Sequence, residues 1–452
     1  MKPTCVVSCP IDTFSGYGAR SRDFVKSLIE SKDKEWDIKI MPQRWGDCPW
    51  NFLSQDDPLR QRFIGKIEQQ PDVWIQITVP NEFQRVGKFN IGVSAGIETT
   101  IYPGEFIEGS NRMDLNLVSS NHSKQVALTS QFDRVDQNTN QKIGMVKMEK
   151  PIEVLFEGLD LDKYYKKPQN SGILKDIKED FCFLYTGHWL PGNFGESRKN
   201  TATLIKTFLE TFKGPNRKKP ALVLKTNQVN YSLLDKETVI RQINRIRDKF
   251  KGENLPNIYL LHGEMSDDEM NQLNNDNKIK AFVSFTKGEG YGRPLAEAAI
   301  TGKPVITTNW SGHVDFINPE YNILVGGELK NIHPSAANDW LIKEAQWFNI
   351  NTEIASKAMK DLYKNYKKYI EQSRKQTKFL SENFSKDKMT ETLKNYLDKI
   401  NPVVNVLPTL ELPKLKRTTS QQPQIQLPKL KKTDSTPKLP QLKLPKLKKA
   451  EV

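Results

Sequence analysis

The chain has 452 residues, and its 68 Lys and Arg outnumber its 54 Asp and Glu to give a net charge of +14 at pH 7. No stretch approaches the roughly 18 consecutive apolar residues of a membrane-spanning helix, which excludes a membrane-spanning protein. The first residues lack the pattern of a secretory signal, so we expect a cytoplasmic protein. The four cysteines are too few for a disulfide scaffold, and we expect Cys5 and Cys9 to be buried thiols rather than zinc ligands.

Short apolar runs alternate with helical patterns over most of the chain, which is typical of parallel sheets covered by helices. Residues 20–30 and 201–212 show helical spacing of their apolar residues, as do residues 238–250. The first series of predicted strands covers residues 5–8, 36–40, 73–79, 89–93, 115–119 and 152–156. The second series covers residues 181–185, 221–225, 258–261, 281–285, 304–308 and 322–325.

The polar residues 160–179 separate the two series. We therefore predict an α/β protein with two Rossmann-like, doubly wound parallel-sheet domains, residues 1–165 and 170–375, facing a central cleft. Residues 335–400 show helical patterns and little strand character, and Ser385 is expected to cap a last helix. We expect that helix, within residues 376–400, to pack back toward the first domain. Residues 129–150 are a polar insertion that is either related to an acceptor or simply a loop.

Most of the excess positive charge lies in residues 401–452, which carry eleven Lys and Arg, three Asp and Glu, eight Pro and no aromatic residue. The first 400 residues keep a net charge of only +6. A Leu-Pro-Lys-Leu-Lys unit recurs at residues 412–416, 427–431 and 444–448. This composition cannot form a packed core, so we predict a disordered basic tail. The tail is either a solvated appendage or a contact for anionic lipid, a protein or nucleic acid.

The most informative segment is residues 287–298, Lys-Gly-Glu-Gly-Tyr-Gly-Arg-Pro-Leu-Ala-Glu-Ala, which follows a predicted strand. Pro294 suits the first turn of a helix, so the backbone amides of residues 292–295 would point at a bound phosphate. Glu289 and Glu297 would place two carboxylates beside that phosphate, where they suit sugar hydroxyls. The plainer interpretation makes Glu289 a loop charge and Glu297 a solvated helix residue.

This segment, followed by residues 301–309 and by Ser311-Gly312, resembles the donor-site signature of glycosyltransferase family 4. The resemblance covers about residues 1–400 and implies the GT-B architecture, in which the second of two Rossmann-like domains binds most of a nucleotide-sugar. It implies a retaining hexosyltransferase whose substrate is a UDP- or GDP-type sugar, with no cofactor and no metal. The acceptor would be a glycan, a lipid or another compound with a hydroxyl group.

Further segments are similar to motifs of the same family. Residues 15–20, Ser-Gly-Tyr-Gly-Ala-Arg, resemble the loop that approaches the donor, although Gly-x-Gly is also common in ordinary turns. Arg198-Lys199 resembles the basic diphosphate clamp, and Lys225 ends a predicted strand at the same sheet edge. Residues 264–269 look like the segment near the nucleotide base, and residues 157–160 look like the motif that ends the first domain.

The chain departs from the family pattern at three positions. Many relatives have a His in the loop where Glu98 lies, and an Arg where His188 follows Gly187. Arg293 replaces a residue that is usually apolar. Its side chain either reaches a phosphate or an anionic acceptor, or it is an exposed arginine at the helix end.

The resemblance also implies roles for individual residues. Lys199, Lys225 and the amides near Gly292 would stabilise the negative charge that grows on the departing diphosphate, while Glu289 binds the sugar and Glu297 the ribose. We therefore predict Glu289, Lys225 and Lys199 as catalytic residues. The predicted substrate-binding residues are Gly16, Tyr17, Gly18, Glu98, His188, Arg198, Gly290, Tyr291, Gly292, Arg293, Pro294, Leu295 and Glu297.

Two other functions compete with this interpretation. The chain could keep the fold as a non-catalytic nucleotide-sugar-binding or scaffold protein, but the paired carboxylates and the cations argue for catalysis. A sugar transferase acting on DNA is suggested by the basic balance alone. Residues 1–400 lack a dense basic stripe interleaved with aromatic residues, so we do not expect a nucleic-acid partner.

Overall fold

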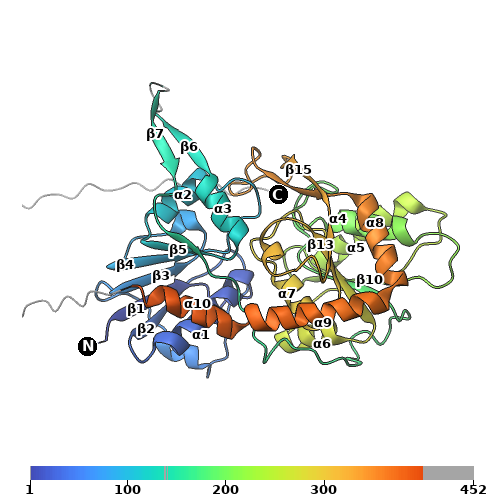
Figure 1. The fold of residues 1–452 in the computed structure, drawn as a ribbon, viewed down its shortest axis with the longest axis horizontal. Coiled ribbons are helices and arrows are strands. Elements are labelled where there is room, and N and C mark those ends of the chain that lie inside the picture. Colours follow the sequence, from blue (N-terminus) through green and yellow to red (C-terminus); the bar gives the residue numbers. More distant parts are fainter. Residues whose placement is uncertain (1, 137–138, 140, 401–452) are drawn as a thin grey trace, which may run out of the picture. The chain divides into compact units, whose positions relative to one another are not determined.

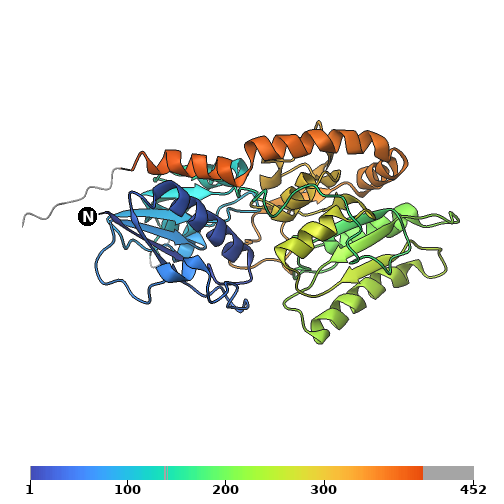
Figure 2. The same cartoon turned by 90° about the horizontal axis from the view of Figure 1, so that it is seen from below.

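The computed structural model describes residues 2–136, 139 and 141–400. Within these residues the chain forms two six-stranded parallel sheets with helices on their faces (Figures 1 and 2). The α/β class with two doubly wound parallel sheets is confirmed. The predicted disordered tail, residues 401–452, lies outside the described residues.

The first sheet has the spatial order β2-β1-β3-β4-β5-β8, and all neighbouring strands are parallel. Its interior strands are nearly continuous apolar runs because both faces of a parallel sheet are covered. Its strands are β1 (Thr4–Cys9), β2 (Asp37–Pro42), β3 (Val73–Ile77), β4 (Phe89–Val93), β5 (Leu115–Val118) and β8 (Ile152–Val154). Its helices are α1 (Gly16–Lys32), α2 (Gly104–Asn111) and α3 (Asn121–Thr129), with short 3-10 turns at Pro58–Arg62 and Pro80–Glu82.

The second sheet has the spatial order β11-β10-β9-β12-β13-β14 and is also parallel throughout. Its strands are β9 (Cys182–Thr186), β10 (Ala221–Lys225), β11 (Ile258–Leu261), β12 (Ile279–Val283), β13 (Val305–Thr308) and β14 (Ile323–Val325). Its helices are α4 (Thr201–Phe212), α5 (Leu233–Arg247), α6 (Asp267–Asn275) and α7 (Arg293–Ile300), with 3-10 turns at Asp248–Phe250 and Gly312–Asp315. The predicted strand runs 221–225 and 258–261 match β10 and β11.

The carboxyl-terminal helices are α8 (Thr352–Lys364), α9 (Tyr366–Asn383) and α10 (Lys386–Leu397). Ser385 caps α10 through a hydrogen bond from the Lys388 N–H to its Oγ, as the sequence predicts. Met389, Leu393 and Leu397 of α10 are buried in the same apolar cluster as the first sheet. Figure 2 accordingly shows α10 beside α1, although α10 directly follows α9, which packs against α7 of the second sheet.

Two antiparallel hairpins supplement the parallel sheets, and one of them corrects the sequence analysis. Residues 335–400 are not helical throughout, because β16 (Gln346–Ile350) pairs with β15 (Gly327–Asn331). The short apolar run around Trp347 is ambiguous between helix and strand by its pattern, and the structure buries the Trp347 side chain fully. The insertion at residues 129–150 contains the hairpin of β6 (Gln131–Val135) and β7 (Lys142–Lys147) rather than only a loop. Its predicted relation to an acceptor stays a prediction.

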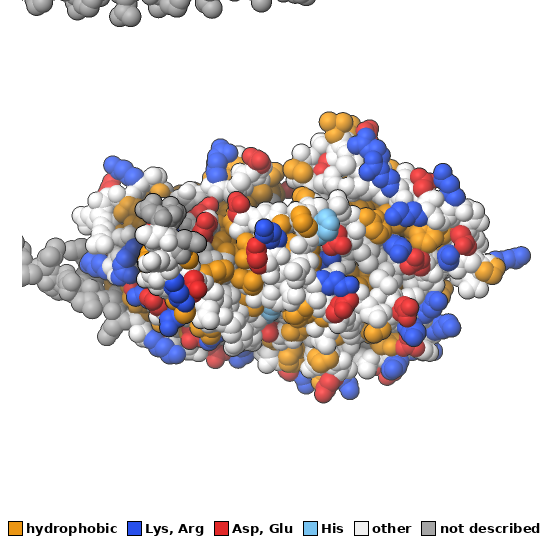
Figure 3. Space-filling model, turned by 90° about the horizontal axis from the view of Figure 1, so that it is seen from above, with side chains coloured by type: hydrophobic (Ala, Val, Ile, Leu, Met, Phe, Trp, Pro, Cys, Tyr) orange, Lys and Arg blue, Asp and Glu red, His pale blue; other side chains and the backbone are white. Residues whose placement is uncertain are grey.

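The described surface carries charges of both signs. On the face drawn in Figure 3, Lys and Arg side chains are interspersed with Asp and Glu side chains and do not form one basic stripe. This agrees with the modest net charge of +6 for residues 1–400.

Candidate functional site

The topology of each sheet brings particular loops together. β1 lies between β2 and β3, and β9 lies between β10 and β12, so the chain changes direction across the sheet at these strands. Ligands of doubly wound sheets bind beyond the carboxyl ends of the strands at this switch point. In the second sheet the loop after β9 carries Gly187 and His188, and the loop after β12 carries residues 287–292. Residues that are about a hundred positions apart in sequence therefore meet at one sheet edge.

A cavity of about 1060 Å³ lies at these strand ends and is lined by loops of both sheets. It includes all three predicted catalytic residues, Glu289, Lys225 and Lys199. The predicted substrate-binding residues that line it are Gly16, Tyr17, Glu98, His188, Arg198, Gly290, Tyr291, Gly292, Arg293, Pro294 and Glu297. The chain thus brings most of the predicted site into one space.

Two predicted substrate-binding residues do not line the cavity. Leu295 is only 2 % exposed and packs in the apolar core beneath α7. Gly18 faces the Thr13 carbonyl, which a Cβ at this position would approach to 2.3 Å, so this glycine allows α1 to start against the preceding loop. Both residues therefore have a packing role in the structure, and their predicted part in substrate binding stays a prediction.

The expected amide cradle at the start of α7 is also smaller than predicted. Pro294 has no N–H, and the Leu295 N–H donates to the Gly292 carbonyl at 3.0 Å. Of the four residues 292–295, this leaves the amides of Gly292 and Arg293. Gly292 itself requires a glycine, because its φ of 105° lies in the left-handed region.

Glu289 is the centre of the charged part of the site. Lys199 Nζ lies 2.6 and 2.8 Å from its two carboxylate oxygens, and Arg198 Nη1 lies 3.2 Å from one of them. Burial by itself would raise the pKa of Glu289, but the ion pairs with Lys199 and Arg198 outweigh it and lower the pKa to about 2. The predicted diphosphate clamp and the predicted sugar-binding carboxylate are therefore bonded to each other in the structure.

The second cation of the cavity is bound differently. Lys225 Nζ donates to the Gly263 carbonyl and lies 5.4 Å from the centre of the Tyr231 ring. Burial lowers the pKa of Lys225. His188 is exposed to the same cavity, and desolvation there, followed by the positive charges of Lys199 and Lys225, lowers its pKa. Among the described residues no Asp or Glu side chain forms an ion pair with Lys225, although the charges of Glu264 and Glu269 in the same lining partly oppose the lowering of its pKa.

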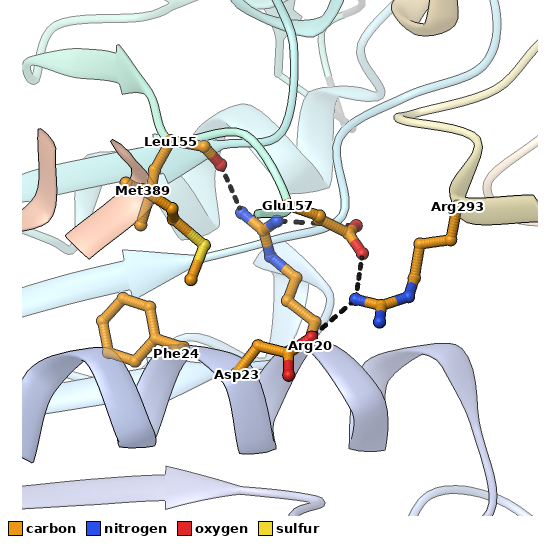
Figure 4. A pocket seen from close by; sticks show the side chains of 7 residues that line it. All are labelled: Arg20, Asp23, Phe24, Leu155, Glu157, Arg293 and Met389. Carbon is orange, nitrogen blue, oxygen red and sulfur yellow. Dashed lines mark hydrogen bonds and ion pairs between the residues drawn. The ribbon is translucent and has the colours of Figure 1, made fainter. Parts of the chain in front are cut away.

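Arg293 belongs to a second charged cluster, shown in Figure 4. Its Nη1 lies 2.7 Å from Asp23 and 3.3 Å from Glu157, and its Nε lies 3.6 Å from Glu297. Arg20 reaches Glu157 at 3.5 Å, so the Glu157 carboxylate lies between two guanidinium groups. The Arg293 guanidinium thus faces three carboxylates and is not an exposed helix-end arginine, while its predicted contact with a phosphate or an anionic acceptor stays a prediction.

The hairpin that sequence reasoning missed supports two loops of the site. The Phe348 N–H of β16 donates to the Lys287 carbonyl at 2.9 Å, next to Glu289. The Thr100 N–H, two residues after Glu98, donates to the Gln346 carbonyl at 3.0 Å. Gly288 allows these loops to meet, because a Cβ there would lie 2.0 Å from the Glu98 carbonyl. Arg198 Nη2 completes the contact at 3.4 Å from the Glu98 carboxylate.

Several lining residues were not predicted. Phe14, Trp45 and Phe52 come from the loops after β1 and β2, where no motif or period marks them. Arg22 lies on α1, Tyr231 lies in the loop after β10, and Met270 lies on α6.

We expect Glu297→Gln to stabilise the protein more at pH 8 than at pH 4.5. Burial, opposed by Arg293, raises the pKa of Glu297 from 4.5 to about 7. Between these values the native carboxyl holds a proton that the unfolded chain has released, so stability falls as pH rises through this window. The penalty at pH 8 is at most roughly 3 kcal/mol and is absent in the amide. Urea unfolding of both proteins at the two pH values measures it, and a pH-independent difference would contradict it.

Two kinds of feature are not found among the described residues. No helix within residues 2–136 or 141–400 is both long and apolar enough to cross a membrane. In the same part of the chain, no group of three or more His, Cys, Asp or Glu side chains is placed to hold a metal ion.

Solved structures share this fold. Sucrose-phosphate synthase from Thermosynechococcus elongatus matches with a TM-score of 0.56 and 10% identity, over 88% of this chain and 99% of that one. Anabaena HepE in complex with UDP-glucose matches with a TM-score of 0.55 and 11% identity, over 88% and 100%. The lipopolysaccharide outer core galactosyltransferase WaaB matches with a TM-score of 0.52 and 14% identity, over 88% and 100%.

These structural neighbours are GT-B glycosyltransferases, and the chain therefore has the predicted GT-B fold. Neither a protein-family model nor a curated protein sequence matches the chain.

Proposed function

We propose that this protein is a retaining glycosyltransferase that moves a hexose from a UDP- or GDP-type sugar to an acceptor hydroxyl without a metal. The observation that carries the proposal is the adjacent pair Arg198 and Lys199, which meets Glu289 inside the cavity at the switch point of the second sheet. The complexes of the neighbour HepE with UDP and with UDP-glucose support a nucleotide-sugar as the donor. In this proposal residues 170–375 form the donor domain and residues 1–165 the acceptor side.

The proposed reaction exchanges one bond at the anomeric carbon of the sugar. The bond from this carbon to the diphosphate oxygen breaks, and a bond to the acceptor oxygen forms on the same face. The acceptor proton passes to the departing phosphate oxygen. Lys199 and Lys225 stabilise the negative charge that grows on the diphosphate, and fixed cations in a partly enclosed cavity do so more strongly than water.

We propose that Glu289 changes its binding partners when the donor binds. The donor diphosphate takes the place of the Glu289 carboxylate, which pairs with both Lys199 and Arg198 in the structure. The released carboxylate then accepts hydrogen bonds from hydroxyls of the donor sugar. Glu297 lines the cavity from α7, and its proposed role is to accept hydrogen bonds from the ribose.

The test is to incubate the protein with UDP-, GDP- and ADP-sugars and to measure released nucleotide with and without EDTA. We expect turnover with at least one donor, no loss in EDTA, and a loss of about a hundredfold in Lys225→Ala. Failure of every donor, or full activity of Lys225→Ala, would contradict the proposal. Binding of a nucleotide-sugar without hydrolysis or transfer would instead indicate the non-catalytic alternative.

A further inference from the structure

Four aromatic side chains line the cavity on the side of the first sheet. Phe14 and Tyr17 come from the loop after β1 and the first turn of α1, and Trp45 and Phe52 come from the segment after β2. The rings of Tyr17 and Trp45 are stacked with their centres 4.1 Å apart. Phe14 and Phe52 meet edge to face at 5.0 Å. We call these four residues the aromatic wall.

The aromatic wall is held by contacts between the two segments that form it. The Phe14 N–H donates to the Pro49 carbonyl at 3.0 Å, and the Phe52 N–H donates to the Asp12 carbonyl at 3.1 Å. The buried Asp12 carboxylate also accepts from the Leu53 N–H at 2.8 Å and pairs with Arg60 at 3.0 Å. These bonds fix the rings in place before a ligand arrives, which lowers the entropy cost of binding.

Among the described lining residues that belong to the first sheet and its helices, Arg22 is the one with a basic side chain. Its guanidinium carbon lies 3.4 Å from the centre of the Phe52 ring, and its Nη1 donates to the carbonyls of Ile11 and Thr13 at 2.8 and 3.0 Å. The cation is thus engaged with the wall and the backbone. A phosphate-bearing acceptor would find no row of cations on this side, in contrast to Arg198, Lys199 and Lys225 across the cavity.

We propose that the aromatic wall binds an uncharged pyranose ring, so that the acceptor is a carbohydrate rather than a phospholipid. This inference rests on the proposed function, which assigns the charged side of the cavity to the donor. Aromatic faces attract flat, partly apolar ligands, and a sugar ring presents such a face through its C–H groups. The hydroxyls at the ring edge remain directed toward the donor side and the polar lining residues there.

The test measures saturation-transfer NMR of methyl glucoside, methyl galactoside and methyl mannoside with the full-length protein, beside sedimentation with phosphatidylglycerol vesicles. We expect at least one pyranoside to receive saturation in its ring protons. Its Kd rises about tenfold in Trp45→Ala and in Phe52→Ala, and it recovers in Trp45→Phe. Trp340→Phe, an exposed tryptophan outside the cavity lining, is the matched control and leaves this Kd unchanged. Thermal melting of each variant confirms that it is folded.

The outcomes separate the two proposals when nucleotide binding is measured on the same samples by calorimetry. Suppose that the protein binds UDP or GDP but no pyranoside, or that Trp45→Ala and Phe52→Ala leave the pyranoside Kd unchanged. Either result would contradict the proposed role of the aromatic wall and leave the proposed function intact. Pyranoside binding that depends on the wall, without any nucleotide binding, overturns the proposed function and leaves the wall standing. Vesicle binding that Trp45→Ala abolishes would identify a lipid acceptor and contradict the inference.

Discussion

Replacing Glu289 by Gln is expected to tighten the binding of the nucleoside diphosphate about tenfold while it lowers sugar transfer by about a hundredfold. In the structure the Glu289 carboxylate lies 2.6 Å from Lys199 and 3.2 Å from Arg198, so a diphosphate must compete with it for both cations. A charge-assisted hydrogen bond contributes about 1.5–3 kcal/mol, and its removal frees the cations for the ligand. Transfer falls because the amide accepts hydrogen bonds from the sugar hydroxyls more weakly than the carboxylate does.

The measurement is calorimetric titration with UDP and GDP together with the nucleotide-release assay on the same preparation. Glu210→Gln is the matched control, because Glu210 is an exposed carboxylate on α4 that pairs with Lys206 at 3.5 Å away from the cavity. Tighter nucleotide binding together with slower sugar transfer distinguishes this role of Glu289 from a general loss of function, which would weaken both. Weaker nucleotide binding by Glu289→Gln would show that the carboxylate does not occupy the diphosphate position.

Replacing Arg293 by Met is expected to lower the free energy of unfolding by about 3–5 kcal/mol. The Arg293 guanidinium is the shared partner of Asp23, Glu157 and Glu297, and the side chain of Glu157 is only 8% exposed. Its removal leaves buried carboxylates facing one another with Arg20 as the remaining cation at Glu157. The loss is therefore dominated by uncompensated charge and exceeds the strength of any one pair.

Urea unfolding at pH 8 measures this effect. Arg134→Met provides the comparison, because Arg134 pairs with Glu108 at the surface, where both side chains are about half exposed, and such pairs are worth at most about 1 kcal/mol. A loss in Arg293→Met no larger than that in Arg134→Met would mean that the cluster is hydrated and does not depend on its arginine.

The sheets could be predicted from the sequence because buried parallel strands are continuous apolar runs. The runs at residues 89–93, 221–225 and 258–261 coincide with β4, β10 and β11. The placement of Lys225 and Glu289 at one edge followed from strand ends alone. By contrast, β16 was missed because a five-residue run with one Trp and one Phe carries too short a period to distinguish it from a helix.

The contacts within the site could not be predicted in the same way. Glu289 and Lys199 are 90 residues apart, and their bond depends on which strands are neighbours, which no local pattern encodes. The ion pairs of Arg293 involve Asp23 on α1 and Glu157 after β8, both far from Arg293 in the sequence. Trp45 lies in an irregular segment without periodicity, so its place in the cavity appears only when the β1 and β2 loops are seen together.

A crystal structure of the protein with bound UDP or GDP would show whether the diphosphate displaces Glu289 from Lys199 and Arg198. We expect the diphosphate oxygens to lie within hydrogen-bond distance of Lys199 and Arg198, the Glu289 carboxylate to have left both cations, and the nucleotide to fill the cavity beside Lys225. A nucleotide bound outside this cavity, or a diphosphate beside an intact Glu289–Lys199 pair, would contradict this expectation.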